Sequence, residues 1–246
     1  ASLTIYGSNG YGDEHVLRQL IQREKPDAIM HFTDPRYWIW LYQIEHEIRQ
    51  KMPIMFYTIW DNDPAPWYNR NHYQSCDALF CISKQKFNFC KQILGEDKVQ
   101  VIKDKPLAVM TPPKTLLSYI PHGINPKKFY KLDPNNTEDM ALKDNARRQL
   151  FGNDDPEFVL FYNSRNIRRK KSSDIIWAYK DFWHRLPEEK REGVRLVMHT
   201  QPIDEHGTDL PAVIRDLCPE VKVIFSNNRT DTKTLNAIYN NADVVI

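Results

Sequence analysis

Five basic residues lie within one short turn of this chain, where they could bind a phosphate group. They are Arg165, Arg168, Arg169, Lys170 and Lys171. The turn follows a short apolar run at residues 158–162 and precedes a helical pattern. Guanidinium groups form paired hydrogen bonds with phosphate oxygens, and the free N–H groups at a helix N-terminus attract the same anion. The pattern therefore predicts an anion site, with a solvated basic turn as the alternative.

The helix after this turn is predicted from capping residues and apolar spacing. Ser172, Ser173 and Asp174 are candidate N-caps. The apolar residues that recur at helical spacing after them are Ile175, Ile176, Tyr179 and Phe182. This arrangement places a helix N-terminus beside the basic residues, at the end of a strand.

A second candidate for phosphate binding is the glycine-rich segment 7–12, with the sequence GSNGYG. It follows a predicted strand at 3–6 and precedes a predicted helix at 15–23, as a phosphate-binding loop would. The spacing is not GxGxxG, however, and no P-loop lysine follows. The sequence therefore favours a plain Gly/Asn turn.

Strand-like and helix-like runs alternate along the chain, which predicts an α/β protein. The strand-like runs are apolar on both faces, as is typical of buried parallel strands. Predicted strands occupy 3–6, 28–32, 54–59, 78–82, 117–120, 158–162, 195–199, 221–225 and 244–246. Predicted helices occupy 15–23, 38–48, 87–94 (with Ser83 as N-cap), 141–150, 174–183, 210–217 and 232–240.

The segment 125–139 divides these elements into two series. It is rich in Pro, Asn, Lys and Asp, the composition of an exposed connection. We therefore predict an N-terminal Rossmann-like domain at 1–130 and a C-terminal one at 131–246. Parallel α/β sheets bind ligands at the carboxyl ends of their strands, and two such domains can face each other across a cleft. The basic turn lies at such a strand end.

Composition limits the functional classes. The chain has 246 residues with 34 basic and 32 acidic side chains, so its net charge of +2 creates no global attraction for nucleic acid or anionic membranes. No apolar stretch approaches the roughly 20 residues of a membrane span, and the N-terminus lacks a signal-peptide pattern. These features predict a soluble, cytoplasmic protein. The four cysteines show no CxxC spacing, which favours buried reduced thiols.

Three segments, taken in order, carry a resemblance to a known family. They are YIPHGINPKKFY at 119–130, FYNSRNIRRKK at 161–171 and TLNAIYNNADVVI at 234–246. Together they resemble the retaining glycosyltransferases of the GT-B fold, the broad family-four group (glycosyl transferases group 1). His122 stands where that family more often has Asn, and Asn125 where it more often has Asp. The resemblance implies two facing Rossmann-like domains, and a family pattern that continues beyond both ends of this chain.

The resemblance also implies roles for residues of the second domain. Arg165 and Lys170 would contact the diphosphate of a nucleotide-diphosphate sugar, with Lys171 as an alternative to Lys170. Asn227 and Asn228 would lie where the family recognises the nucleotide base, or would form a surface turn. The nucleotide sugar is a co-substrate, and no cofactor is expected. The second domain has no DxD pair at a strand end, so a divalent metal has little support.

In the first domain the resemblance is weaker. Family members often carry a His-Asp pair after the strand at 54–59, where this chain has Trp60 and Asp61. Asp61 is the favoured polar contact near the transferred sugar. Asp34 and His122, together with Trp60, are candidates for the acceptor side. His31 and Trp38 could join that pocket, although a core histidine and a capping role for Asp34 are the simpler interpretations.

The sequence therefore predicts a metal-independent glycosyltransferase that transfers a sugar with retention. The acceptor (glycan, lipid, protein or small molecule) is not specified. One alternative is a non-catalytic module that binds a nucleotide sugar or glycan. The other is an RNA or single-strand binder that uses the basic turn with Tyr162 and Trp177.

Overall fold

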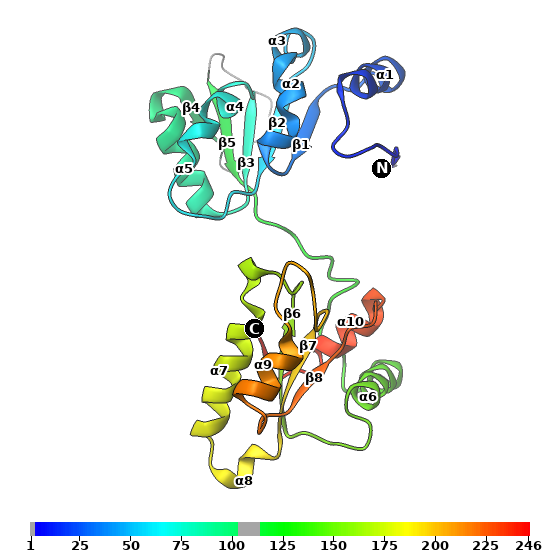
Figure 1. Ribbon diagram of the computed structural model, residues 1–246. Coiled ribbons are helices and arrows are strands. Elements are labelled where there is room, and N and C mark those ends of the chain that lie inside the picture. The colour runs from blue at the N-terminus through cyan, green and yellow to red at the C-terminus, as the bar shows by residue number, and fades with distance from the viewer. Residues whose placement is uncertain (1–2, 103–113) are drawn as a thin grey trace. The chain divides into compact units, whose positions relative to one another are not determined.

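The computed structural model describes residues 3–102 and 114–246, which form two compact α/β units (Figure 1). The first unit is Ala1–Gly123 and the second is Ile124–Ile246. We had placed the division after Tyr130. The connecting segment already packs on the second unit at Tyr130, because two of its backbone N–H groups bond to that unit. The N–H of Tyr130 donates to Asn236 in helix α10 (Thr232–Tyr239) at 3.1 Å, and the N–H of Leu132 donates to Asn240, just after that helix, at 3.0 Å.

The first unit contains a five-stranded parallel sheet in the order β1-β2-β3-β5-β4. Its strands are β1 (Ile29–Phe32), β2 (Ile54–Thr58), β3 (Ala78–Cys81), β4 (Val99–Val101) and β5 (Thr115–Tyr119). Its α-helices are α1 (Glu14–Glu24), α2 (Ile39–Gln43), α3 (Glu45–Ile48), α4 (Arg70–Gln74) and α5 (Lys84–Leu94), and its 3-10 turns are η1 (Pro35–Trp38), η2 (Trp67–Asn69) and η3 (Glu96–Lys98).

Local sequence signals explain most of these elements. Ser83 caps α5, since its hydroxyl accepts from the N–H of Lys86 at 3.0 Å, as predicted. The helix predicted at 38–48 is instead η1 followed by α2 and α3. It breaks at Ile44, whose backbone leaves helical geometry (φ −111°, ψ 9°) and bonds to the carbonyl of Leu41, three residues back.

One predicted strand of this unit does not form, and one observed strand was not predicted. Residues 3–6 form no strand, and the side chains of Leu3 and Ile5 are 86% and 83% exposed. The apolar pattern there has no neighbouring strand to pair with, and β1 remains an edge strand. Strand β4 was not predicted, because three residues with a central Gln carry too weak an apolar signal.

The second unit contains a four-stranded parallel sheet in the order β8-β7-β6-β9. Its strands are β6 (Phe158–Asn163), β7 (Val194–His199), β8 (Val223–Phe225) and β9 (Val244–Val245). Its helices are α6 (Thr137–Phe151), α7 (Ser172–Arg185), α8 (Glu188–Arg191), α9 (Leu210–Leu217) and α10, with the 3-10 turn η4 (Arg168–Lys170).

Strand β6 shows why this sheet must be covered on both faces. Val159 and Phe161 pack into an apolar cluster with α6 and α10, whereas Leu160 and Tyr162 pack into another with α7 and α9 (Figure 1). Alternate side chains of a strand point to opposite faces, so a strand between two helical layers is apolar throughout. This confirms the expected class, an α/β fold with parallel sheets flanked by helices.

Two further predictions from the sequence concern the cysteines and membrane-spanning helices. All four cysteines (Cys76, Cys81, Cys90 and Cys218) are free and buried, as predicted. In the described part of the chain, no helix is both long and apolar enough to cross a membrane.

Candidate functional site

The carboxyl ends of β6, β7 and β8 form one polar edge of the second sheet. Asn163 and His199 are paired across β6 and β7. Nδ1 of His199 lies 3.0 Å from the hydroxyl of Ser226, which directly follows β8. Burial lowers the pKa of His199, so the ring is neutral at pH 7. The parallel register therefore gathers polar groups from three strands at the edge where this fold class binds ligands.

Arg165 lies two residues beyond β6, and its side chain is 63% exposed. Its Nε donates to Asp204 at 3.1 Å, in the loop after β7. The N–H of His206 and the Arg165 guanidinium lower the pKa of Asp204, so this carboxylate is ionised. A guanidinium has five N–H donors, and this pair uses only part of them. Arg165 is thus held by Asp204 and still accessible to an anion.

The neighbouring residue, Asn166, builds the loop that carries Asp204. Its side chain is 1% exposed. Its Nδ2 donates to the carbonyls of Gln201, Pro202 and Thr208, and its Oδ1 accepts from the N–H of Thr208 at 3.1 Å. Gly207 is needed beside it, since a Cβ there would lie 2.2 Å from the carbonyl oxygen of Asn166. Asn166 therefore positions the partner of Arg165.

The basic turn ends at the N-terminus of α7, but not with the predicted cap. Lys171 occupies the cap position in the left-handed region (φ 53°), and no side chain caps the helix. Ser172, a proposed cap, instead points to the core, where its hydroxyl lies 2.9 Å from that of Tyr162 on β6. The first N–H groups of a helix have no intrahelical acceptors. Their donors and dipole favour an anion at this position.

Lys170 and Lys171 are both exposed, and they differ in backbone geometry: Lys170 ends η4, and Lys171 adopts the left-handed conformation. We expect one of the two alanine variants, Lys170→Ala or Lys171→Ala, to lose about tenfold more affinity for a nucleoside diphosphate than the other, because a single ammonium reaches the anion. Titration calorimetry on both proteins, side by side, measures this difference. Equal losses would show that the two lysines contribute only a diffuse positive field.

Asn227 and Asn228 follow β8 at the same edge of the sheet. The carbonyl of Asn227 accepts from the side chain of Gln201 at 3.3 Å, and the carbonyl of Asn228 accepts from Thr230. Both asparagines line a cavity of about 170 Å³ between β8 and the helices α6 and α10. The loop at 200–208 thus links the Asn227 segment to Asn166, the neighbour of Arg165. The structure brings the second-unit candidates to one edge.

In the first unit, the candidate residues follow the ends of the strands: Asp34 comes after β1, and Trp60 and Asp61 come after β2. Asp34 caps η1: its Oδ1 accepts from the N–H of Arg36 at 3.0 Å, which is the simpler role considered above. Trp60 donates its indole N–H to the carbonyl of Asn62 at 2.6 Å and packs edge-on against Tyr68. Asp61 is exposed. The WDNDP segment is therefore a turn that leaves the Asp61 carboxylate accessible.

His122 belongs to an aromatic cluster at the carboxyl edge of the first sheet. Its ring stacks on Tyr57 (5.5 Å between centroids, 14° between planes) and lies 6.2 Å from the ring of Phe32. Tyr57 also donates to the carbonyl of Ile120 at 2.8 Å, which holds the chain just before His122. Phe32 is 48% exposed. The three rings are in contact at the carboxyl ends of the strands, with the Phe32 ring tilted by 33° to Tyr57 and 46° to His122.

His31 does not join this surface. It is 2% exposed, stacks on Phe56 and shares a hydrogen bond with the hydroxyl of Tyr42 at 2.8 Å. Trp38 packs beside it and donates to the carbonyl of Phe32. Burial lowers the pKa of His31 to about 3. It is a core histidine that stays neutral in the folded protein.

This burial predicts a loss of stability in acid. Below pH 6.5 the unfolded chain binds a proton at His31 that the folded chain rejects until about pH 3. Protonation therefore stabilises the unfolded state, and the free energy of unfolding should fall by up to about 1.4 kcal/mol per pH unit in that window. Urea unfolding at pH 7 and pH 5 should show a shallower pH dependence in His31→Gln than in the exposed control His184→Gln. Parallel slopes would contradict the assignment.

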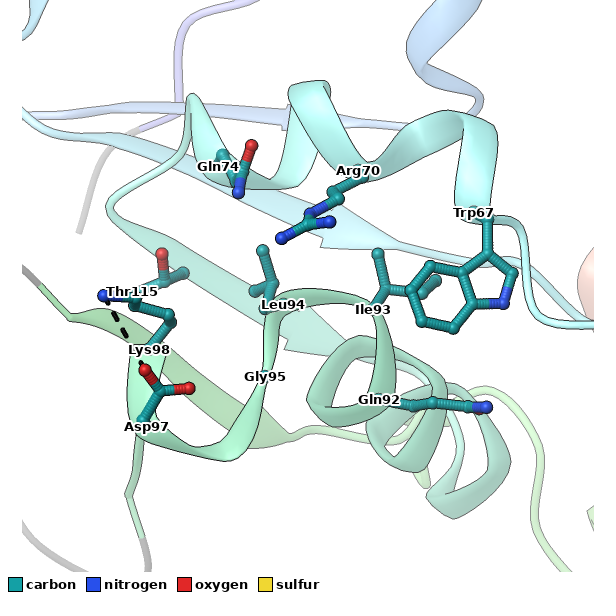
Figure 2. A pocket seen from close by; sticks show the side chains of 10 residues that line it. All are labelled: Trp67, Arg70, Gln74, Gln92, Ile93, Leu94, Gly95, Asp97, Lys98 and Thr115. Carbon is teal, nitrogen blue, oxygen red and sulfur yellow. Dashed lines mark ion pairs between the residues drawn. The ribbon is translucent and has the colours of Figure 1, made fainter.

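A separate cavity of about 590 Å³ lies elsewhere in the first unit, at the C-terminus of α5 and the start of β5 (Figure 2). Trp67 lies at one end of it and the Asp97–Lys98 ion pair (3.6 Å) at the other, with Arg70 reaching in between. None of the predicted site residues lines this cavity. Within residues 3–102 and 114–246, no group of three His, Cys, Asp or Glu side chains could hold a metal ion.

The sequence interpretation did not identify Asp204 or Asn166. Each makes its contacts with residues that are distant in the sequence. Arg165 and Asp204 are 39 positions apart, and Asn166 and Thr208 are 42 positions apart. A usable signal was the turn-type segment Asp204 to Gly207, in the loop that follows a predicted parallel strand ending at His199.

The fold and the polar strand ends define a class: an α/β protein with parallel, helix-flanked sheets and an anion-accessible arginine at a strand end. No protein-family profile matches the chain, and no curated protein sequence matches it. Solved structures with the same fold do exist.

The chain is similar to an α,α-trehalose 6-phosphate synthase from Burkholderia multivorans, with 14% identity and a TM-score of 0.60 over 94% of this chain and 53% of that one. It is also similar to the N-terminal domain of the trehalose-6-phosphate phosphatase of Candida albicans, with 15% identity and a TM-score of 0.64 over 94% of this chain and 52% of that one. A third similar structure is described as trehalose-6-phosphate from E. coli bound with UDP-2-fluoro glucose. It shares 15% identity with this chain, with a TM-score of 0.56 over 94% of this chain and 54% of that one. The chain spans about half the length of these proteins, and at such identities the likeness concerns the fold.

Proposed function

We propose that this chain is part of a glycosyltransferase of the GT-B type, related to the family-four group, that uses a nucleotide-diphosphate sugar. The observation that carries the proposal is Arg165, which lies exposed at the carboxyl end of β6 beside the uncapped N-terminus of α7. The fold supports it, because the structural neighbours include UDP-forming trehalose-phosphate synthases and a structure bound with UDP-2-fluoro glucose. The resemblance noted in the sequence points to the same class.

The proposed chemistry explains why cations are needed at this edge. When a sugar leaves its nucleotide diphosphate, negative charge develops on the diphosphate, and groups already oriented toward it lower the barrier. Arg165 would supply a two-pronged contact and Lys170 or Lys171 a point charge. The N–H groups at the start of α7 would add to both. Asn227 and Asn228 would lie beside the nucleotide base. These groups act without a metal or cofactor in this proposal.

The acceptor would bind at the first unit. The rings of Phe32, Tyr57 and His122 suit an acceptor with a flat apolar face, such as a sugar ring. Asp61 would orient a hydroxyl of that acceptor. In a retaining reaction the leaving phosphate helps to deprotonate the acceptor on the same face of the sugar, so Asp61 is proposed as a positioning residue and not as a strong base.

A melting-temperature screen tests the proposal. We expect one of UDP-, GDP- or ADP-sugars to raise the melting temperature equally with and without EDTA, because side-chain cations and a helix N-terminus neutralise the diphosphate. A ligand at about 100 times its dissociation constant adds roughly 2.7 kcal/mol to stability. A shift that requires magnesium or manganese would contradict the metal-independent mechanism. Single-stranded RNA that binds with a steep salt dependence, in place of nucleotide sugars, would overturn the proposed class.

A further inference from the structure

Two cysteines of the first unit lie in contact inside the core. Cys81 ends β3 and Cys90 lies in α5, and their sulfur atoms are 3.8 Å apart. Both side chains are 0% exposed. The Cys81 thiol donates to the Cys90 sulfur in this arrangement. A disulfide requires the sulfurs to approach from this contact distance to about 2.05 Å.

A buried lysine accompanies the pair. Lys86 lies in the first turn of α5, is 0% exposed, and donates to the hydroxyl of Tyr73 at 2.6 Å. Its ammonium also lies beside the Cys90 sulfur. None of the ion pairs formed by the described residues includes Lys86. A buried ammonium is costly unless a partner compensates it. The Cys90 sulfur, one helical turn away on α5, is one of the groups beside it that can become an anion.

The acid–base properties agree with this geometry. The hydrogen bond from Cys81 and the ammonium of Lys86 lower the pKa of Cys90 against the opposing effect of burial. The hydrogen bond to Cys90, together with burial, raises the pKa of Cys81. Burial lowers the pKa of Lys86, while the neighbouring sulfurs oppose that shift. Cys90 is therefore the more acidic thiol of the pair and Cys81 the less acidic one.

We propose that Cys81 and Cys90 form a redox pair, in which a hydroperoxide oxidises Cys90 and Cys81 then closes a disulfide. In the first step Cys90 ionises and its thiolate attacks one peroxide oxygen, so that the O–O bond breaks and Cys90 becomes a sulfenic acid. The other oxygen leaves as hydroxide or alkoxide and takes up the proton that Cys90 released, which gives water or an alcohol. In the second step the Cys81 sulfur displaces the hydroxyl group, which leaves as water with the Cys81 proton. The net reaction with hydrogen peroxide converts two thiols and one peroxide into one disulfide and two waters.

The other two cysteines lie outside this pair. The Cys76 thiol donates to the carbonyl of His72 at 3.3 Å and contacts the hydroxyl of Tyr42. The Cys218 thiol contacts the carbonyl of Val213 in the second unit. Cys218 has Lys180 nearby, which donates to the carbonyl of Leu217, but Cys218 has no second cysteine in contact with its sulfur in the described structure. Because Cys81 and Cys90 are fully buried, only a small oxidant admitted by local fluctuations can reach them, and hydrogen peroxide is the appropriate probe.

Hydrogen peroxide followed by non-reducing tryptic mass spectrometry tests the pair. Cleavage after Lys84 and Lys86 separates the Cys81 peptide from the Cys90 peptide, so a disulfide appears as a cross-linked pair lighter by about 2 Da that dithiothreitol reverses. The cross-link should persist in Cys76→Ser, whose cysteine shares the tryptic peptide of Cys81, and disappear in Cys81→Ser. Sulfinic acid at Cys90 without a cross-link, a cross-link through Cys76, or four unmodified cysteines in the folded protein would each overturn the proposal.

Lys86→Met separates the role of the charge from that of the packing. The methionine fills the site without an ammonium, and an ordinary thiol with a pKa of about 8.5 is only a few per cent thiolate at neutral pH. We expect cross-linking to slow at least about tenfold in this variant. Tyr73→Phe, which leaves the ammonium in place, should retain most of the rate and serves as the second variant if Lys86→Met does not fold. An unchanged rate in a folded Lys86→Met protein would remove Lys86 from the mechanism.

Discussion

Arg165→Ala should weaken the binding of a nucleoside diphosphate by about 1.5 to 3 kcal/mol, which is roughly a 10- to 150-fold rise in the dissociation constant. The range is that of a charge-assisted hydrogen bond. Asp204 holds the guanidinium at the carboxyl end of β6, and alanine removes both the donors and the charge. The side chain is 63% exposed, so the fold should lose little stability. Titration calorimetry with the nucleotide that raises the melting temperature most measures the loss.

Arg169→Ala is the matched control for this experiment. Arg169 lies in the same turn, is exposed, and carries the same charge. If Arg165 makes a specific contact, the control should lose no more than about 1 kcal/mol, the value typical of exposed charges. Equal losses in the two variants would replace the specific site with a diffuse basic surface. Unchanged affinity in a folded Arg165→Ala protein would remove Arg165 from the site.

Asn166→Ala should lower the free energy of unfolding by about 2 to 4 kcal/mol. Its amide joins three backbone carbonyls and one backbone N–H of the loop at 200–208, and it is 1% exposed. The Pro202 carbonyl keeps its bond from the N–H of Leu210, but alanine removes the side-chain partners of the Gln201 and Thr208 groups. Each part-buried group left unsatisfied costs about 1 to 3 kcal/mol, reduced where water enters. Urea unfolding measures the change, with the exposed Asn153→Ala as control.

The Asn166→Ala substitution should also weaken ligand binding at the Arg165 site. The loop that Asn166 anchors carries Asp204, which holds Arg165. We expect the variant to bind the nucleoside diphosphate more weakly although Asn166 itself is buried away from solvent. A loss below about 1 kcal/mol in unfolding free energy, or undiminished affinity, would show that the loop keeps its shape without the amide.

Elements with strong local signals were predictable. Strands β6 and β7 are apolar throughout because both faces of the sheet are covered, and α5 begins where Ser83 can cap it. The basic turn at 165–171 could be recognised because five arginine and lysine residues lie close together in the sequence. Predictions failed where tertiary contacts overrode a local pattern. Residues 3–6 have the apolar character of a strand but pair with no other strand in the described structure, and Ser172 could cap α7 but bonds to Tyr162 instead.

By itself, the sequence determined that this is an α/β chain with parallel, apolar strands and a phosphate-compatible turn at the end of one of them. Helix and strand periodicity, capping residues and clustered charge all act over a few positions, so they are readable along the chain. Only the tertiary structure decided that Asp204 holds Arg165, that Asn166 builds the loop between them, and that Cys90 meets Cys81 in the core. The first two pairings join residues about 40 positions apart, and the third depends on which face of α5 is buried against β3. Such contacts arise from packing and burial, which a linear pattern does not specify.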